Sequence, residues 1–202
     1  MSTQFIEAIK SGDSDTVATI LKQSPNIIRE TESPVSPIML SVYYGQKQIA
    51  QLLLQTGVAL TLHEAAVVGN LGRVQALLAD NPEQLEELSS DGFSLLGFAA
   101  YFGHEALVKW LLEQGAEVNR KSNNPMKVAA LHSAASAQHV GIARLLLEHR
   151  ADANLEQEQG VRPLHQAAHN GDVEMTRLML QHGADSSLVS DNGKSALDWA
   201  RD

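Results

Sequence analysis

Two short motifs have residue types that could perform chemistry, and neither is complete. Residues 193–195 read Gly-Lys-Ser, as at the end of a phosphate-binding P-loop, but that motif needs a glycine where Leu188 stands. Residues 92–97 resemble the turn that exposes a nucleophilic serine, but the second glycine comes one residue too late. Acidic runs such as residues 83–87 are typical of solvated surface rather than of buried carboxylate pairs. We therefore predict that the protein is not an enzyme and needs no cofactor.

The eight histidines suggest metal binding, and their spacing argues against it. His165 and His169 have the i, i+4 spacing of a metal-binding pair on a helix. However, the sequence has no cysteine, so thiolate ligands are excluded, and most of the other histidines recur at fixed positions of a repeat. Only His169 is expected to point outward. We predict no metal site.

Composition excludes several classes of partner. Fifteen Lys and Arg residues stand against 24 Asp and Glu, for a net charge of -9. A nucleic-acid binder needs a basic face to neutralise phosphates, and an anionic membrane also attracts basic residues, so both are disfavoured. The sequence opens without a basic segment followed by an apolar one, and it has no apolar run of membrane-spanning length. We expect a cytoplasmic protein.

The elements that must position any site form a repeat. A glycine or its substitute follows a short Ala-rich segment six times, and an apolar pair stands eight and nine residues after each. These anchors are Gly12, Gly45, Gly69, Gly103, Gln138 and Gly171. Segments such as 37–45 begin with proline and end with glycine, which predicts a short helix. The apolar spacing at residues 107–112 predicts a second helix, and such pairs must stack to bury their apolar faces.

Residues 162–171, Arg-Pro-Leu-His-Gln-Ala-Ala-His-Asn-Gly, resemble the T-P-L-H-x-A-A-x-x-G signature of ankyrin repeats. The resemblance implies an all-α solenoid of stacked helix pairs with short β-turn fingers. It gives a single domain over residues 1–202, with six full repeats and a partial seventh from about residue 191. It also implies that His63, His132 and His165 order the turns between repeats through hydrogen bonds.

Two features depart from the family pattern. The step from Gly45 to Gly69 is 24 residues instead of about 33, which predicts that the finger between repeats two and three is missing. The seventh repeat stops inside its first helix, so either this half-repeat caps the array or the natural chain continues beyond Asp202.

In the ankyrin family, partners bind the concave surface made by finger tips and first helices, so the resemblance implies a protein-binding module, such as a scaffold or inhibitor. Six of the nine aromatic residues fall on this surface in only two repeats, and aromatic clusters are favoured at binding hot spots. The predicted binding residues are Val35, Leu40, Tyr43, Tyr44, Val67, Val68, Phe93, Phe98, Tyr101, Phe102, His169 and Asn170. Trp199 occupies the matching position of the last half-repeat and would extend the surface.

Two other interpretations of this strip stay open. Phe93 and Phe98 lie nearer the helix interior, so they could instead pack on neighbouring repeats. The strip could also mediate self-association, which would make the protein a structural homodimer. The sequence does not identify the partner, the oligomeric state or the pathway.

Overall fold

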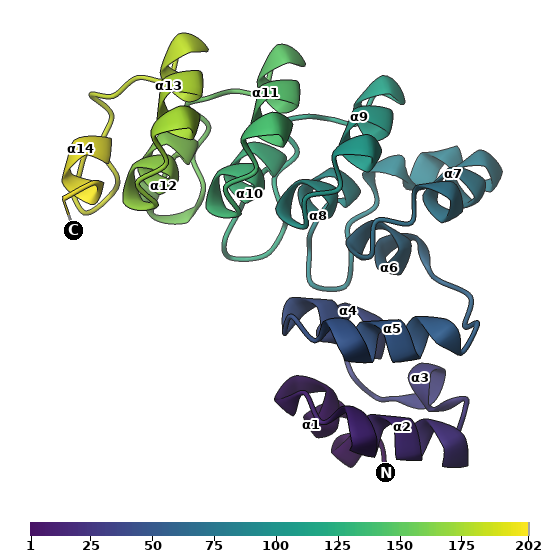
Figure 1. Ribbon diagram of the computed structural model, residues 1–202. Coiled ribbons are helices and arrows are strands. Elements are labelled where there is room, and N and C mark those ends of the chain that lie inside the picture. The colour runs from purple at the N-terminus through teal and green to yellow at the C-terminus, as the bar shows by residue number, and fades with distance from the viewer. Residues whose placement is uncertain (202) are drawn as a thin grey trace. The chain divides into compact units, whose positions relative to one another are not determined.

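Short helices in pairs make up most of the structure, a computed structural model that describes residues 1–201 (Figure 1). The first helices of the repeats are α1 (Ser2–Ser11), α4 (Pro37–Tyr43), α6 (Leu62–Val67), α8 (Leu95–Tyr101), α10 (Ala130–Ser136) and α12 (Pro163–His169). The second helices are α2 (Ser14–Gln23), α5 (Lys47–Gln55), α7 (Leu71–Asp80), α9 (Glu105–Glu113), α11 (Val140–Glu148) and α13 (Val173–Gln181). Three short helices, α3 (Ile27–Glu30), η1 (Pro82–Glu86) and η2 (Glu158–Gly160), lie in connections, and α14 (Ala196–Trp199) begins the seventh repeat. The predicted all-α fold of stacked helix pairs is confirmed.

The helices begin and end where their sequences can satisfy free backbone groups. The Ser36 hydroxyl accepts the Met39 N–H at 3.3 Å, and the Ser94 hydroxyl accepts the Gly97 N–H at 3.0 Å, so both serines cap a first helix. Gly103 ends the turn after α8 with φ of 80°, a conformation that glycine adopts without strain. Gln138 occupies the matching position with φ of 61°, so the residue that replaced the anchor glycine kept the glycine conformation.

The chain divides into two compact units, which we describe separately: Met1–Val68, and the residues from Gly69 onward. The prediction of one uninterrupted domain stays a prediction. In the first unit, α1 packs on α2 and α4, and α4 packs on α5 and α6. Its core contains fully buried Phe5, Ile9, Ile38 and Leu53.

An ion pair joins the first repeat to the third inside the first unit. The Arg29 guanidinium donates to both carboxylate oxygens of Glu64, at 2.6 and 2.7 Å, and to the Ala59 carbonyl at 2.5 Å. Glu64 also accepts the Thr61 N–H at 2.9 Å, which caps α6. Among the described residues, 56–61 form no hairpin, so the predicted loss of the finger is confirmed and the ion pair occupies this region instead.

In the second unit the helices form two rows, with α8, α10 and α12 in one and α9, α11 and α13 in the other (Figure 1). The same kind of hydrogen bond recurs between successive loops that follow the second helices. The Asn119 side chain accepts the Asp152 N–H at 2.8 Å, and Asn154 accepts the Asp185 N–H at 2.8 Å. Each repeat is therefore tied to the next by the same kind of bond, about one repeat apart in sequence.

The predicted turn fingers are present in the second unit. The Ser89 N–H donates to the Phe93 carbonyl at 2.9 Å, and the Ser190 N–H donates to the Lys194 carbonyl at 3.0 Å. The finger of repeat five is longer, because it is closed by the Ser122 N–H and the Val128 carbonyl at 2.8 Å. Neighbouring fingers also bond to each other through their backbones, as between residues 191 and 159.

Candidate partner-binding surface

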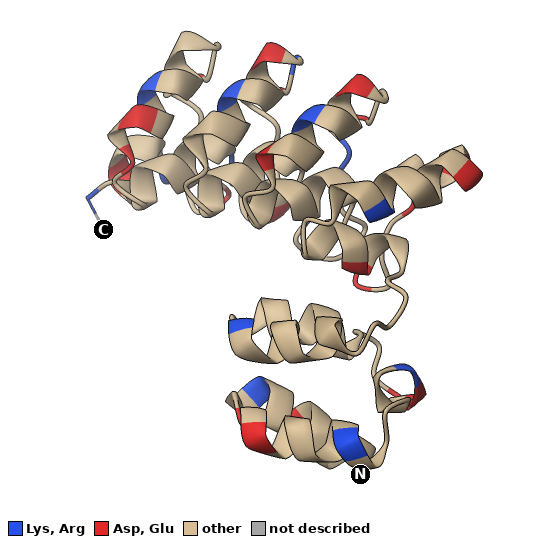
Figure 2. Cartoon of the chain, turned by 45° about the vertical axis from the view of Figure 1, so that its right-hand side comes forward, with Lys and Arg blue, Asp and Glu red and all other residues tan. Residues whose placement is uncertain are grey.

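Charged side chains are absent from the first helices of the three complete repeats that lie wholly in the second unit. None of α8, α10 and α12 contains Lys, Arg, Asp or Glu, whereas their second helices carry exposed basic residues at one repeated position (Figure 2). These basic residues are Lys109, Arg144 and Arg177. The two faces of the stack therefore differ, because only the second-helix face is charged. We call the other one, with Tyr101, Phe102, Ser136, His169 and Trp199, the first-helix face.

In the first unit, Tyr44 is the predicted binding residue with most exposed surface, at 51%. Val35, Tyr43 and Val68 are half-buried. Leu40 and Val67 are buried, so the expectation that they are exposed was wrong. Helix α4 is packed by α1 and α6, which leaves little of its flank free for Leu40. Val67 occupies the same position in its repeat as Tyr101 does in repeat four. A valine side chain extends less far from its helix, however, and is covered by its surroundings.

In the second unit, the four predicted aromatic residues differ in exposure: Phe98 is buried, Tyr101 is exposed, and Phe93 and Phe102 are half-buried. Phe98 is only 4% exposed, and its ring centroid lies 5.5 Å from that of half-buried Phe93, so the packing interpretation holds for Phe98. Tyr101 is 49% exposed and meets Phe102 edge to face, at 5.1 Å between ring centroids. Tyr101 and half-buried Phe102 thus remain as the aromatic part of the predicted site in this unit.

His169 and Asn170, the two polar residues among the predicted binding residues, have different environments. His169 is exposed, and its ring centroid lies 5.8 Å from that of Trp199 in a T-shaped contact. The Asn170 amide instead donates to the Ala135 carbonyl of the preceding repeat at 3.1 Å. The donor group of Asn170 is therefore used to join repeats five and six, and its role in binding a partner stays a prediction.

Buried histidines organise the turns, as the family resemblance implied. His132 accepts the Ala129 N–H at its Nδ1 atom at 3.2 Å, and its Nε2 lies 2.9 Å from the Leu155 carbonyl. This geometry fits a neutral ring that donates from Nε2, and burial lowers the pKa of His132 to about 4. His165 accepts the Arg162 N–H in the same way at 3.1 Å, and burial again lowers its pKa. Both are structural groups.

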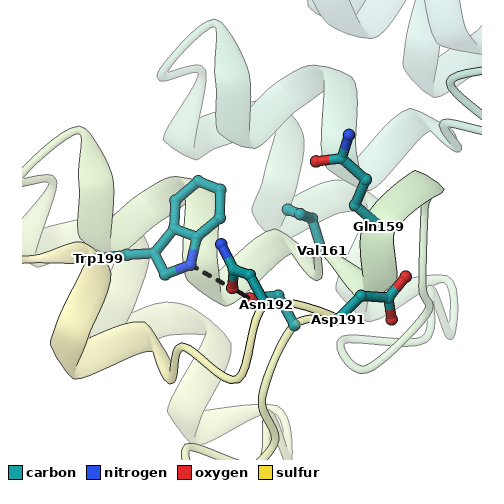
Figure 3. A pocket seen from close by; sticks show the side chains of 6 residues that line it. Gln159, Val161, Asp191, Asn192 and Trp199 are labelled. Atoms are coloured by element: carbon teal, nitrogen blue, oxygen red, sulfur yellow. Dashed lines mark hydrogen bonds between the residues drawn. The ribbon is translucent and has the colours of Figure 1, made fainter.

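Sequence reasoning missed an open cavity of about 260 Å³ near the last half-repeat (Figure 3). The side chains that line it come from two neighbouring fingers and from α14. They are Gln159, Val161, Ser190, Asp191, Asn192 and Trp199. The one available signal was Trp199, since an aromatic residue stands at a first-helix position where its neighbours are polar.

Residues 1–201 contain no cluster of three or more His, Cys, Asp or Glu side chains that could hold a metal ion. No helix within this range is both long and apolar enough to cross a membrane.

Comparison with known proteins supports the repeat assignment. A family model described as ankyrin repeats (3 copies) matches residues 62–157 and 132–201. The chain is 36% identical over 101 residues to the human Transient receptor potential cation channel subfamily A member 1, covering 49% of this chain and 9% of that protein. It is 36% identical over 99 residues to the rat Ankyrin repeat and SAM domain-containing protein 6, covering 49% and 11%. A third relative is the human NAD-capped RNA hydrolase NUDT12, 31% identical over 93 residues, with 46% and 20% covered. The chain thus matches at most a fifth of these relatives' lengths.

Proposed function

Because the chain belongs to the ankyrin-repeat family, we propose that it is a non-enzymatic module that captures a protein partner on its concave surface. Ankyrin repeats are generally protein-interaction modules without catalytic activity. In the second unit, the residues of the first-helix face would make the contact. Within a cell, we place this activity in the cytoplasm.

The observation that carries the proposal is the uncharged first-helix face with an exposed aromatic pair. Interface centres are depleted of charge and enriched in aromatic residues, whereas their rims are polar. Tyr101 and Phe102 provide the aromatic area, and exposed Ser136 and His169 provide hydrogen-bonding groups beside it. The acidic balance of the whole chain would affect the association rate and the choice of partner more than the affinity.

The experiment compares Tyr101→Ser with Val173→Ser as baits in a host lysate, read by quantitative mass spectrometry. Val173 is 68% exposed on α13 in the second row, so its variant removes a similar apolar surface from the other face. We expect a protein that the wild type and Val173→Ser retain and that Tyr101→Ser loses, with both variants folded by circular dichroism. Equal retention by the two variants would contradict the assignment of the face.

Self-association on the same face is the alternative. Sedimentation velocity of the purified wild type separates the two, because only self-association predicts a dimer that depends on concentration and disappears in Tyr101→Ser. A monomer at all concentrations leaves capture of a different protein as the function of the face.

A further inference from the structure

The cavity near the C-terminal half-repeat has walls that are fixed by hydrogen bonds. The Asp191 N–H donates to the Gln159 carbonyl at 2.9 Å, which sets the register of the two fingers. Beneath them, the buried guanidinium of Arg162 donates to the carbonyls of Gly160 and Val189, at 2.9 Å each, and pairs with Glu156. The cavity is therefore a property of the folded finger pair rather than of a loose loop.

The lining combines an aromatic side with an acceptor-rich rim. Figure 3 shows the indole of Trp199 on one side of the cavity, with Gln159 and Val161 on the other. The indole N–H donates to the Ser190 hydroxyl at 3.4 Å, which holds the ring at the wall. Gln159, Asp191 and Asn192 are exposed and offer amide or carboxylate oxygens.

Acidic side chains lie at the rim of the cavity and beside it. Within residues 1–201, neither Asp191 nor the adjacent finger residue Glu158 forms an ion pair, and no lining residue is cationic. The buried Arg162 guanidinium close by already pairs with Glu156. A positively charged group that enters the cavity would therefore meet the aromatic ring of Trp199 in the lining and, at the rim, a carboxylate of Asp191 that takes part in no ion pair among the described residues.

We propose that this cavity receives an arginine side chain of the protein partner. A guanidinium is planar, stacks on an indole and presents five donors to several acceptors at once, so it fits this lining better than a lysine ammonium does. The volume of the cavity is below that of sites for drug-sized ligands, which suits a single side chain. This inference rests on the proposed function, because it names a chemical group on the captured protein.

The test uses two short probes that differ only in charge: acetyl-Ala-Arg-Ala-amide and the same peptide with citrulline, the uncharged analogue of arginine. The Trp110→Phe variant leaves Trp199 as the sole tryptophan, so its fluorescence reports the cavity directly. We expect saturable quenching by the arginine peptide and binding of the citrulline peptide that is weaker by about fivefold or more. In the wild type, the indole N–H signal of Trp199 in the NMR spectrum should shift during the same titration, which checks the result without a substitution.

Two variants locate the charge that matters. Asp191→Asn should weaken binding of the arginine peptide by about threefold or more. Glu113→Gln, which removes an exposed carboxylate from α9, should leave the affinity for this peptide unchanged. Equal affinity for both peptides, equal loss in both variants, or no saturable response of Trp199 would each overturn the proposal. These outcomes do not depend on capture by Tyr101, so the proposed function can stand when the arginine site fails, and the reverse.

Discussion

The ion pair between Arg29 and Glu64 leads to a specific prediction about the stability of the first unit. The Glu64 side chain is 1% exposed, and it accepts two hydrogen bonds from Arg29 and one from the Thr61 N–H. Arg29→Ala would remove the two charged bonds and leave the buried carboxylate with only the Thr61 N–H and the Ser36 side chain as partners. Removing one partner of a buried pair costs about 3–5 kcal/mol. Because the Arg29 side chain is itself 37% exposed, water can partly replace it, so we expect about 3 kcal/mol.

Native-state hydrogen exchange is the appropriate assay, because it reports residues 1–68 separately from the rest of the chain. The matched control is Lys10→Ala, which breaks the exposed pair between Lys10 and Glu7 and should leave the stability of the first unit nearly unchanged. Glu64→Gln keeps an oxygen for the Thr61 N–H and should cost less than Arg29→Ala. A loss below about 1 kcal/mol in Arg29→Ala, or a loss equal to that of the control, would refute the reasoning.

The same ion pair makes the stability of the first unit depend on pH. Burial alone would raise the pKa of Glu64, but hydrogen bonds from Arg29 and Thr61 outweigh it and hold the pKa below its ordinary value. A carboxylate with a lowered folded pKa stabilises the native state above its unfolded pKa, and this contribution is lost as the pH falls through the folded value. The stability of the first unit should therefore decrease with acid below about pH 4.5 in the wild type, and less steeply in Glu64→Gln.

Three further predictions concern the second unit. The pKa of His132 is about 4 in the folded protein, against an ordinary value of 6.5. Its contribution to the free energy of unfolding should therefore be complete above pH 6.5 and fall by roughly 3 kcal/mol on acidification to pH 4, which urea denaturation at each pH would measure. Gln138→Gly should raise the melting temperature, because the left-handed conformation costs a non-glycine residue about 1 kcal/mol and glycine avoids this cost. An unchanged or lower melting temperature would contradict this strain. Phe98→Ala should destabilise by about 3–5 kcal/mol and Tyr101→Ala by less than about 1 kcal/mol in denaturant titrations, since only Phe98 is buried; similar losses would contradict the division of the aromatic group.

Repeat register and helix ends were accessible from sequence, because glycines, prolines and capping serines act locally. The exposure of individual side chains within a first helix could not be predicted in this way. Phe98 and Tyr101 are three residues apart and thus close to one helix face, yet one is 4% and the other 49% exposed. The difference comes from neighbouring elements, such as the finger residue Phe93 against Phe98, and periodicity within a single helix does not contain it.

The cavity could not be predicted from the sequence, for a related reason. Its walls come from two fingers whose register is set by a backbone bond between residues 191 and 159, and backbone bonds leave no pattern in side-chain identity. Trp199 was recognised as a first-helix residue, but the acceptors that surround it could be placed only once the fingers were in register. The same holds for Arg162, which stands at the threonine position of the family motif and spans both fingers.

The asparagine bonds between successive loops of the second unit have a mechanical consequence. Asn119 and Asn154 each hold the loop of the following repeat, so tension applied along the stack loads equivalent bonds in series. Under an optical trap, the second unit should therefore lengthen in discrete steps of about one repeat, and it should recover those lengths as the force is released.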